Sequence, residues 1–444
     1  MDLPKKSNLL VKAIFFVISG ALLFLLAADL GERFFVPEAG KISSMAIHKD
    51  LSSPADRMLA KPLLPALLAW MAPFRSFRLL WPFVCALAGT LLGASLLYPL
   101  KLSPHPRCSL LYLFLALLSV PFLFLLTADP GGALGLALLC VATTDMLVHL
   151  QTGRTYPLFS AGVALGFLPL AASWGFYVLL GVFLVNRLLV EVEEHGFLAE
   201  YIVLFTPFLL LGGGWWFLHW VYRKGEPLFP SPSFPLAEGA SFPISGFLLL
   251  LTALLLLFSI SCGKDRAGCV ISFRFFFLAF LGLGVMWILL PWEEPRLRMI
   301  LLSLGILLVF LGSVLHPLRN HLSLGLLLGL LCVGTWWELP RNSENLAFWK
   351  NALTGENAVS YLYPEEKEIG TFLRNELAGA SVGLEGRAPM VEFLAGDTVR
   401  FVSVYEDPSA EFMLFPFFHI PGKGEDVLFR SPHWILLRRI RGVP

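Results

Sequence analysis

Long apolar runs are the feature of this sequence that most constrains its fold. Continuous apolar segments of about twenty residues recur along most of the chain, and each is long enough to cross a hydrocarbon core of about 30 Å. In total 57% of the 444 residues are hydrophobic and only 15% are charged. A soluble protein of this size does not need so much apolar surface. The sequence therefore predicts a polytopic α-helical membrane protein.

We expect eleven membrane spans, whose limits follow from the apolar runs. The predicted spans cover residues 11–28, 79–100, 109–127, 131–150, 157–172, 174–189, 200–221, 243–261, 275–291, 299–315 and 322–338. The pair 157–172 and 174–189 is short, but the other spans keep their orientation if both are re-entrant. Lysines precede the first run and no small-residue cleavage site follows it, which indicates a retained span rather than a removed signal.

Lysine and arginine in the short loops orient these spans. With the N-terminus in the cytoplasm, every short inner loop is basic. The outer side then receives the long loop 29–78, the turn at Asp129, the loop 222–242, the segment 293–298 and the residues after 338. The chain is compact and carries no eukaryotic retrieval signal. We therefore predict a multi-pass protein of the bacterial inner (cytoplasmic) membrane.

The composition changes near residue 343, where charged residues become frequent. We expect a helix at Glu365–Glu376 and short strands at 381–384, 399–404 and 434–437. The predicted organisation is a membrane domain over 1–338 and a small extracytoplasmic α/β domain over 339–444. Within the first outer loop, segment 40–60 fits helices lying along the interface, and 61–71 is too short to span.

Three short charged motifs fall on the predicted outer side. The first follows span one and holds Asp29, Glu32, Arg33, Asp56, Arg57 and Lys61. The second is Thr127-Ala128-Asp129-Pro130, and the third is Glu294-Pro295-Arg296-Leu297-Arg298. Charged groups beside lipid are expensive to keep, so several on one face predict a site for a charged lipid head group.

Each motif allows two interpretations. Asp29 can act as a general base, or it can pair with Arg33 one turn along a helix end. Asp129 can face the same cavity as Asp29, or it can form a turn whose proline opens the next helix. Arg296 and Arg298 can bind a phosphate or diphosphate, or anchor the helix end at the interface.

The motifs together resemble the GT-C superfamily of membrane glycosyltransferases, which includes protein O-mannosyltransferases and the bacterial aminoarabinose transferase. Asp29 matches the acid after the first span, and Lys61-Pro62-Leu63-Leu64-Pro65 matches a later stretch of that loop. Asp129 and its neighbours are similar to the family's second acidic loop, with one extra alanine. Glu294-Pro295-Arg296 resembles the family's late Glu-Pro-Arg. The family's doubled acid is here Asp29 and Glu32, which leaves the choice between them open.

The resemblance implies transfer of one sugar from a polyprenyl-phosphate donor to a lipid, glycan or protein acceptor of the envelope, on the outer face, with inversion. Asp29 would be the general base and Asp129 a second catalytic acid. The substrate-binding residues would be Glu32, Arg33, Asp56, Arg57, Lys61, Glu294, Arg296 and Arg298. No cofactor is assigned, and participation of a divalent metal stays open. A net charge of +1 argues against a nucleic-acid partner.

Two other functions compete with this one. An O-antigen polymerase or ligase also uses outer arginines on polyprenyl carriers, but its key loop comes later in the chain. A lipid or glycan transporter predicts ionisable residues inside the spans and two repeated halves. The spans are almost free of charge and no halves repeat, so we favour the transferase.

The glycines at 212–214 indicate close helix contact rather than phosphate binding.

Overall fold

The computed structural model describes most of the apolar runs and most of the C-terminal region. The described residues are 17–28, 63–73, 76–103, 106–172, 174–175, 197–222, 244–260, 266–289, 295–315, 321–338, 364–384, 388–403, 410–416, 419, 421–422 and 424–439. The chain forms two compact units. The first comprises Met1–Leu23, Leu59–Pro65 and Ala86–Lys350, and the second Phe24–Met58, Ala66–Cys85 and Asn351–Pro444. The boundary predicted at 338–339 stays a prediction.

Helices occupy every predicted span that falls within the described residues. They are Val17–Ala28, α5 (Phe77–Leu100), α6 (Pro106–Leu118), α7 (Val120–Ala128), α8 (Pro130–Thr152), α9 (Thr155–Ala171), α11 (Phe197–Phe208), α12 (Gly214–Tyr222), α13 (Ile244–Ser259), α14 (Arg266–Leu289), α15 (Pro295–Leu315) and α16 (His321–Glu338). The predicted span 174–189 lies almost entirely outside the described residues.

Among the described residues, three helices are long and apolar enough to cross a membrane by themselves. These are Leu79–Leu100, Pro130–Thr152 and Ala199–Tyr222, and the bent pair α6 and α7 makes a fourth if it counts as one span. Shorter apolar helices account for the other predicted spans within this part of the chain. The helical membrane fold is thus confirmed, and the number eleven stays a prediction.

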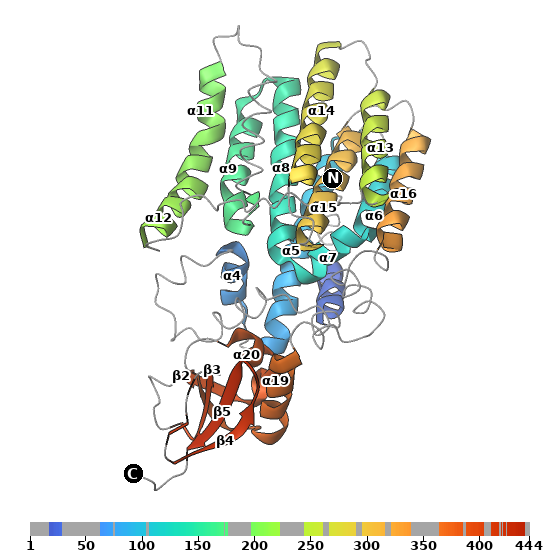
Figure 1. The fold of residues 1–444 in the computed structure, drawn as a ribbon. Coiled ribbons are helices and arrows are strands. Elements are labelled where there is room, and N and C mark those ends of the chain that lie inside the picture. The colour runs from blue at the N-terminus through green and yellow to red at the C-terminus, as the bar shows by residue number, and fades with distance from the viewer. Residues whose placement is uncertain are drawn as a thin grey trace, which may run out of the picture. The chain divides into compact units, whose positions relative to one another are not determined.

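Helix α15 is the centre of the first unit, with α6, α7, α8, α13 and α14 packed against it (Figure 1). Its residues are buried almost continuously from Met299 to Val314. Two glycines one heptad apart, Gly305 and Gly312, let leucine side chains of α13 lie directly on the α15 backbone. Small residues of this kind allow helices to approach closely where no hydrophobic effect drives them together.

The predicted span 109–127 is broken in the structure. Helices α6 and α7 are bent by 67° at Ser119. Pro121 lies near the start of α7 and has no N–H to donate, and its ring clashes with the carbonyl group four residues earlier. The single straight span that we predicted is therefore replaced by a long and a short helix.

Glycines also set the contact between α9 and α11. A Cβ at Gly162 would lie under 3.0 Å from the backbone carbonyl of Leu204, and one at Gly166 would lie 2.9 Å from that of Pro207. Gly212 belongs to the π-helical turn η2 (Leu209–Gly213), and its Cβ would meet the Gly166 carbonyl at 2.9 Å. The predicted role of the 212–214 glycines in helix contact is confirmed at Gly212.

The C-terminal residues form a mixed five-stranded sheet in the order β2-β1-β3-β5-β4. Its elements are α19 (Pro364–Glu376), β1 (Ser381–Leu384), α20 (Pro389–Ala395), η3 (Gly396–Thr398), β2 (Arg400–Ser403), β3 (Phe412–Pro416), β4 (Glu425–Arg430) and β5 (Trp434–Arg439). β1 pairs in parallel with β2 and β3, whereas β5 pairs antiparallel with β3 and β4. The predicted helix and three strands are confirmed, and β3, β4 and α20 were not predicted.

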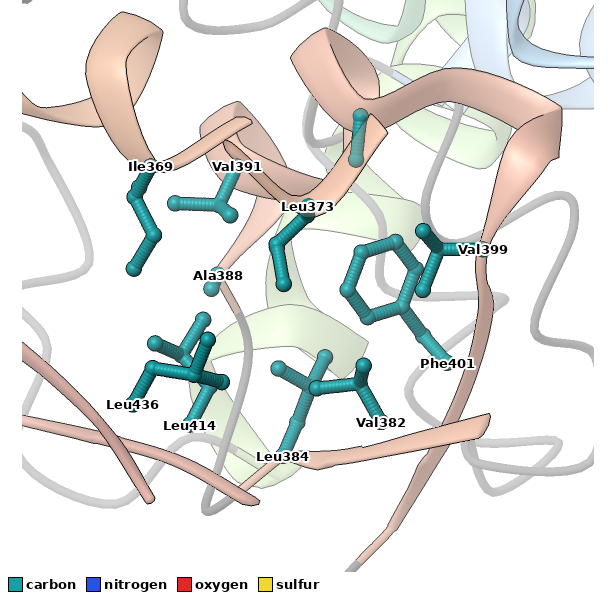
Figure 2. Packing of buried hydrophobic residues seen from close by; sticks show 11 residues of the cluster. Ile369, Leu373, Val382, Leu384, Ala388, Val391, Val399, Phe401, Leu414 and Leu436 are labelled. Carbon is teal, nitrogen blue, oxygen red and sulfur yellow. The ribbon is translucent and has the colours of Figure 1, made fainter. Parts of the chain in front are cut away.

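Both helices of this domain pack on one face of the sheet. Side chains of α19 and α20 meet alternate residues of the strands in one buried cluster, which Figure 2 shows. The cluster comprises Ile369, Leu373, Val382, Leu384, Ala388, Val391, Ala395, Val399, Phe401, Leu414 and Leu436. The intervening residues Met413, Phe415, Ile435 and Leu437 form a second buried cluster. Strands β3 and β5 are therefore buried on both sides, as central strands usually are.

Parts of α4 (Leu63–Trp70) and α5 belong to the same unit as this sheet. Trp81 of α5 is buried with Ala27 and Ala69, and Leu394 of α20 packs against that cluster. The Ser76 hydroxyl also donates a hydrogen bond to Asp397 beside α20. These contacts fasten residues 66–85 to the C-terminal α/β fold.

The Glu365 carboxylate joins α19 to the turn between β4 and β5. Its hydrogen bonds there are expected to make the stability of the fold depend on pH. Glu365 accepts a hydrogen bond from the His433 N–H at 3.1 Å, and the His433 ring Nδ1 lies 3.1 Å from the same carboxylate. Burial opposes ionisation, but hydrogen bonds from Ser431 and His433 outweigh it and lower the pKa of Glu365. A lowered folded-state pKa stabilises the fold above the unfolded pKa, and this stabilisation is lost as the pH falls through the folded pKa.

We therefore expect Glu365→Gln to lower the thermal unfolding temperature at pH 7, and this difference to shrink below pH 4. Intrinsic fluorescence of the full chain in detergent measures it. Glu368→Gln, an exposed acid on the same helix, is the matched control and should change little at either pH. A Glu365→Gln effect that is equal at both pH values would contradict the linkage.

Candidate functional site

Asp129 lies at the junction of α7 and α8, and its side chain is only 2% exposed. Its Oδ1 accepts a hydrogen bond from the Gly132 N–H at 3.0 Å, so it caps the N-terminus of α8. Pro130 occupies the first helical position, where a missing N–H costs nothing. The helix dipole favours a negative charge at this point. The turn-and-cap interpretation of Asp129 is therefore correct, and a catalytic role is compatible with it.

Gly132 is required by this arrangement. A Cβ at position 132 would lie 2.7 Å from the Asp129 Oδ2 and 2.5 Å from a methyl carbon of Leu125. A larger residue would displace the Asp129 carboxylate or the Leu125 side chain of α7. The sequence Asp-Pro-Gly-Gly thus holds a buried carboxylate in a fixed position on the helix axis of α8.

Asp129 and the arginine motif begin two helices that pack together. Both α7 and α8 contact α15, and α8 and α15 start at the same end of the helical unit (Figure 1). Arg296 and Arg298 lie in the first turn of α15. Their side chains are outside the described residues, as is Glu294 entirely. The structure therefore brings the second and third motifs to one end of the helical unit.

The remaining candidate residues lie outside the described part of the chain. They are Asp29, Glu32, Arg33, Asp56, Arg57 and Lys61. Their roles stay predictions. Within the residues that the structure describes, no group of three or more His, Cys, Asp or Glu side chains is arranged to hold a metal ion.

A buried polar group at the other end of α8 was missed by sequence reasoning. Asp145 is 4% exposed and accepts a hydrogen bond from the Tyr98 hydroxyl of α5 at 2.7 Å. One turn further, His149 Nδ1 lies 2.7 Å from the Arg154 carbonyl and Nε2 lies 3.3 Å from Glu200 Oε1 of α11. A lone acid inside an apolar run was the available signal, because Asp145 falls within the predicted span 131–150.

This group is separate from the Asp129 site. Asp145 follows Asp129 by sixteen positions, which corresponds to about 24 Å of helix. A carbonyl oxygen only accepts, so His149 Nδ1 is the donor in its hydrogen bond to Arg154. The polar pairs therefore join α8 to α5 and α11 at the predicted cytoplasmic end.

Removing the Tyr98 hydroxyl should destabilise the protein. Tyr98→Phe leaves the buried Asp145 without this hydrogen bond, at a cost of about 1–3 kcal/mol. Thermal unfolding of the purified protein measures the loss. Tyr222→Phe, at the exposed end of α12, removes a hydroxyl of the same kind and should have little effect. Equal unfolding temperatures for the two variants would show that the Tyr98–Asp145 bond contributes nothing.

The described residues combine a bundle of apolar helices with a small C-terminal α/β fold. No protein family model and no curated protein sequence matches the chain. Among solved structures, it is similar to ArnT from Cupriavidus metallidurans, an aminoarabinose transferase.

Two crystal structures of that protein align over nearly the full chains. The structure bound to undecaprenyl phosphate covers 97% of this chain and 98% of its own, with a TM-score of 0.55 and 11% identity. The apo structure covers the same shares, with a TM-score of 0.52 and 12% identity. At such low identity the likeness establishes the fold.

Proposed function

We propose that this protein transfers a single sugar from a polyprenyl-phosphate donor to an acceptor on the outer face of a bacterial inner membrane. The observation that carries the proposal is the fold, which aligns over 97% of the chain with a transferase structure that holds undecaprenyl phosphate. The buried carboxylate at the start of α8 and the arginine-bearing start of α15 lie at one end of the helical unit, where they would supply an acid and cations to a lipid phosphate.

In the proposed reaction an acceptor hydroxyl or amine attacks the anomeric carbon opposite the phosphate. Asp29 takes the acceptor proton, the new glycosidic bond forms, and the bond from the anomeric carbon to the phosphate oxygen breaks. The polyprenyl phosphate leaves with both electrons of that bond, and the anomeric centre is inverted. Arg296, Arg298 and Lys61 would stabilise the charge that develops on the phosphate.

Asp129 would act as the second acid of the site. The cap hydrogen bond to Gly132 fixes one carboxylate oxygen, and the helix dipole stabilises its charge. A carboxylate held in this way is suited to orient an acceptor or a neighbouring catalytic group rather than to move during the reaction. Asp29, or Glu32 in its place, then keeps the role of proton acceptor.

Donor consumption by the full chain in lipid nanodiscs tests the proposal. Wild type is offered a panel of radiolabelled polyprenyl-phospho-sugars with membrane lipid extract as acceptor, beside a variant carrying Asp29→Asn and Arg296→Ala. We expect one donor to lose its label with wild type only. Label loss that survives in the double variant would refute these roles, and chelation with EDTA in the same assay decides whether a divalent metal takes part.

The alternatives predict different results. A polymerase or ligase would consume a diphosphate-linked glycan and leave the monophosphate donors intact. A transporter would move the carrier between leaflets without releasing the sugar. Folded wild-type protein that consumes no monophosphate donor would therefore move the assignment to one of these two classes.

A further inference from the structure

The break between α6 and α7 is held by two side chains from α16. The Trp336 indole N–H donates to the Leu118 carbonyl at 3.1 Å. The Val120 N–H donates to the Thr335 hydroxyl at 3.4 Å, and that hydroxyl donates to the Cys332 carbonyl of its own helix. Two adjacent residues of one helix thus satisfy both sides of a break more than 200 positions earlier in the chain.

These contacts provide hydrogen-bond partners for backbone groups at the break. Within a membrane, backbone groups that lose their helical partners must find others inside the protein. Leu118 ends α6 and Val120 begins α7, so their carbonyl and N–H lie at the point where the regular ladder stops. The buried Ser119 between them bonds back to Ala116. Thr335 and Trp336 supply the partners of the Val120 N–H and the Leu118 carbonyl. Helix α16 also packs on both α6 and α7.

The bend decides where Asp129 lies. Helix α7 has nine residues, so it reaches about 13 Å from the break to Asp129. At a bend of 67°, that reach carries Asp129 about 12 Å sideways from the axis of α6. A change of about 10° in the bend would move the tip by about 2 Å. A misplacement of about 1 Å at a reacting centre can cost about 100-fold in rate.

We propose that Thr335 and Trp336 are positioning residues for Asp129: they lock the bend between α6 and α7, and α7 transmits that geometry to the carboxylate at its end. The proposal rests on the proposed sugar transfer, in which Asp129 is a site residue. In Figure 1, α7 runs from the end of α16 across to the start of α8, which is the path that the coupling requires.

The experiment compares Thr335→Val, Trp336→Phe and their combination with two matched controls in nanodiscs. Thr252→Val removes a buried hydroxyl that bonds only within α13, and Trp220→Phe alters an exposed tryptophan of α12. Hydrogen exchange of peptides covering 119–130 is followed by mass spectrometry, together with kcat and KM for the donor. Size-exclusion profiles confirm that each variant is folded.

We expect the double variant to exchange faster over 119–130, to lose at least about tenfold in kcat and to keep its donor KM within about threefold. Thr335→Ser keeps a hydroxyl, so its exchange over 119–130 and its kcat should return to the wild-type values that Thr335→Val loses. The two controls should match wild type. If the wild type transfers no sugar, the proposed function has failed, and the exchange data alone decide whether α16 holds the bend. Unchanged exchange, or faster exchange with unchanged kcat in an active enzyme, would overturn the positioning role.

Discussion

Asp129→Asn is expected to lower the rate of sugar transfer by about 100-fold while leaving α8 intact, because the charge that orients the acceptor or a neighbouring catalytic group is lost. Asparagine is as good an N-cap as aspartate, and its side-chain oxygen can accept the same hydrogen bond from Gly132. The substitution therefore removes the charge and keeps the cap. Few positions allow the structural and the chemical role of one carboxylate to be separated so directly.

Asp129→Ala provides the complementary variant. It removes both the charge and the cap, so it should lose activity and also destabilise the protein by about 1 kcal/mol. Initial rates of donor consumption and thermal unfolding temperatures are measured for wild type and both variants. If Asp129 only caps the helix, Asp129→Asn will retain full activity, and the catalytic assignment falls.

Helix positions were predictable because span length and apolarity are local properties of the sequence. The predicted span 131–150 differs from α8 by a few residues at most. The break at Ser119 was not predictable in the same way, because it is completed by Thr335 and Trp336, which lie far away in the sequence. Pro121 was the only local signal, and proline is tolerated within many membrane helices.

In the C-terminal domain, too, the elements with a clear local sequence pattern were predictable and the others were not. The amphipathic helix at Glu365–Glu376 was predictable from its apolar stripe, of which Ile369 and Leu373 are buried and Phe372 is partly buried. β3 is buried on both faces and so has no alternating pattern, while β4 carries an irregularity between Val427 and Phe429 that breaks its period of two. Neither strand had a clear signal.

The candidate site was predictable as a set of residue types on one side of a membrane, but not as a geometry. For Asp129 the sequence offered both a turn and a catalytic acid, and the structure adds the cap, the burial and the requirement for Gly132. Asp145 and His149 were overlooked because their partners, Tyr98 and Glu200, come from other helices. Contacts of this kind depend on tertiary packing.

Gly162→Ala is expected to cause the largest loss of stability of any conservative substitution considered for the helical unit. The new methyl group would meet the backbone carbonyl of Leu204 on α11, and backbone atoms of a packed helix cannot turn aside as a side chain can. Forcing extra volume into such a contact costs about 1–3 kcal/mol or more. Helices α9 and α11 must separate to admit it.

Alanine substitutions at two other glycines give stability changes with which Gly162→Ala can be compared. At Gly166 the Pro207 carbonyl would lie 2.9 Å from the new Cβ, so Gly166→Ala should destabilise less than Gly162→Ala. Gly93 of α5 has nothing within 4 Å of an added Cβ. There alanine should be neutral or stabilising by up to about 1 kcal/mol, because it is the better helix former.

Thermal unfolding of the three variants in one detergent gives their order directly. The packing of α9 on α11 requires Gly162→Ala to unfold at the lowest temperature, Gly166→Ala next and Gly93→Ala at or above wild type. If all three unfold together, intrinsic helix propensity rather than interhelical contact governs these positions. Because α9 also packs against α8, whose N-cap is Asp129, a parallel fall in transfer activity for Gly162→Ala alone would show that this interface helps to hold the site.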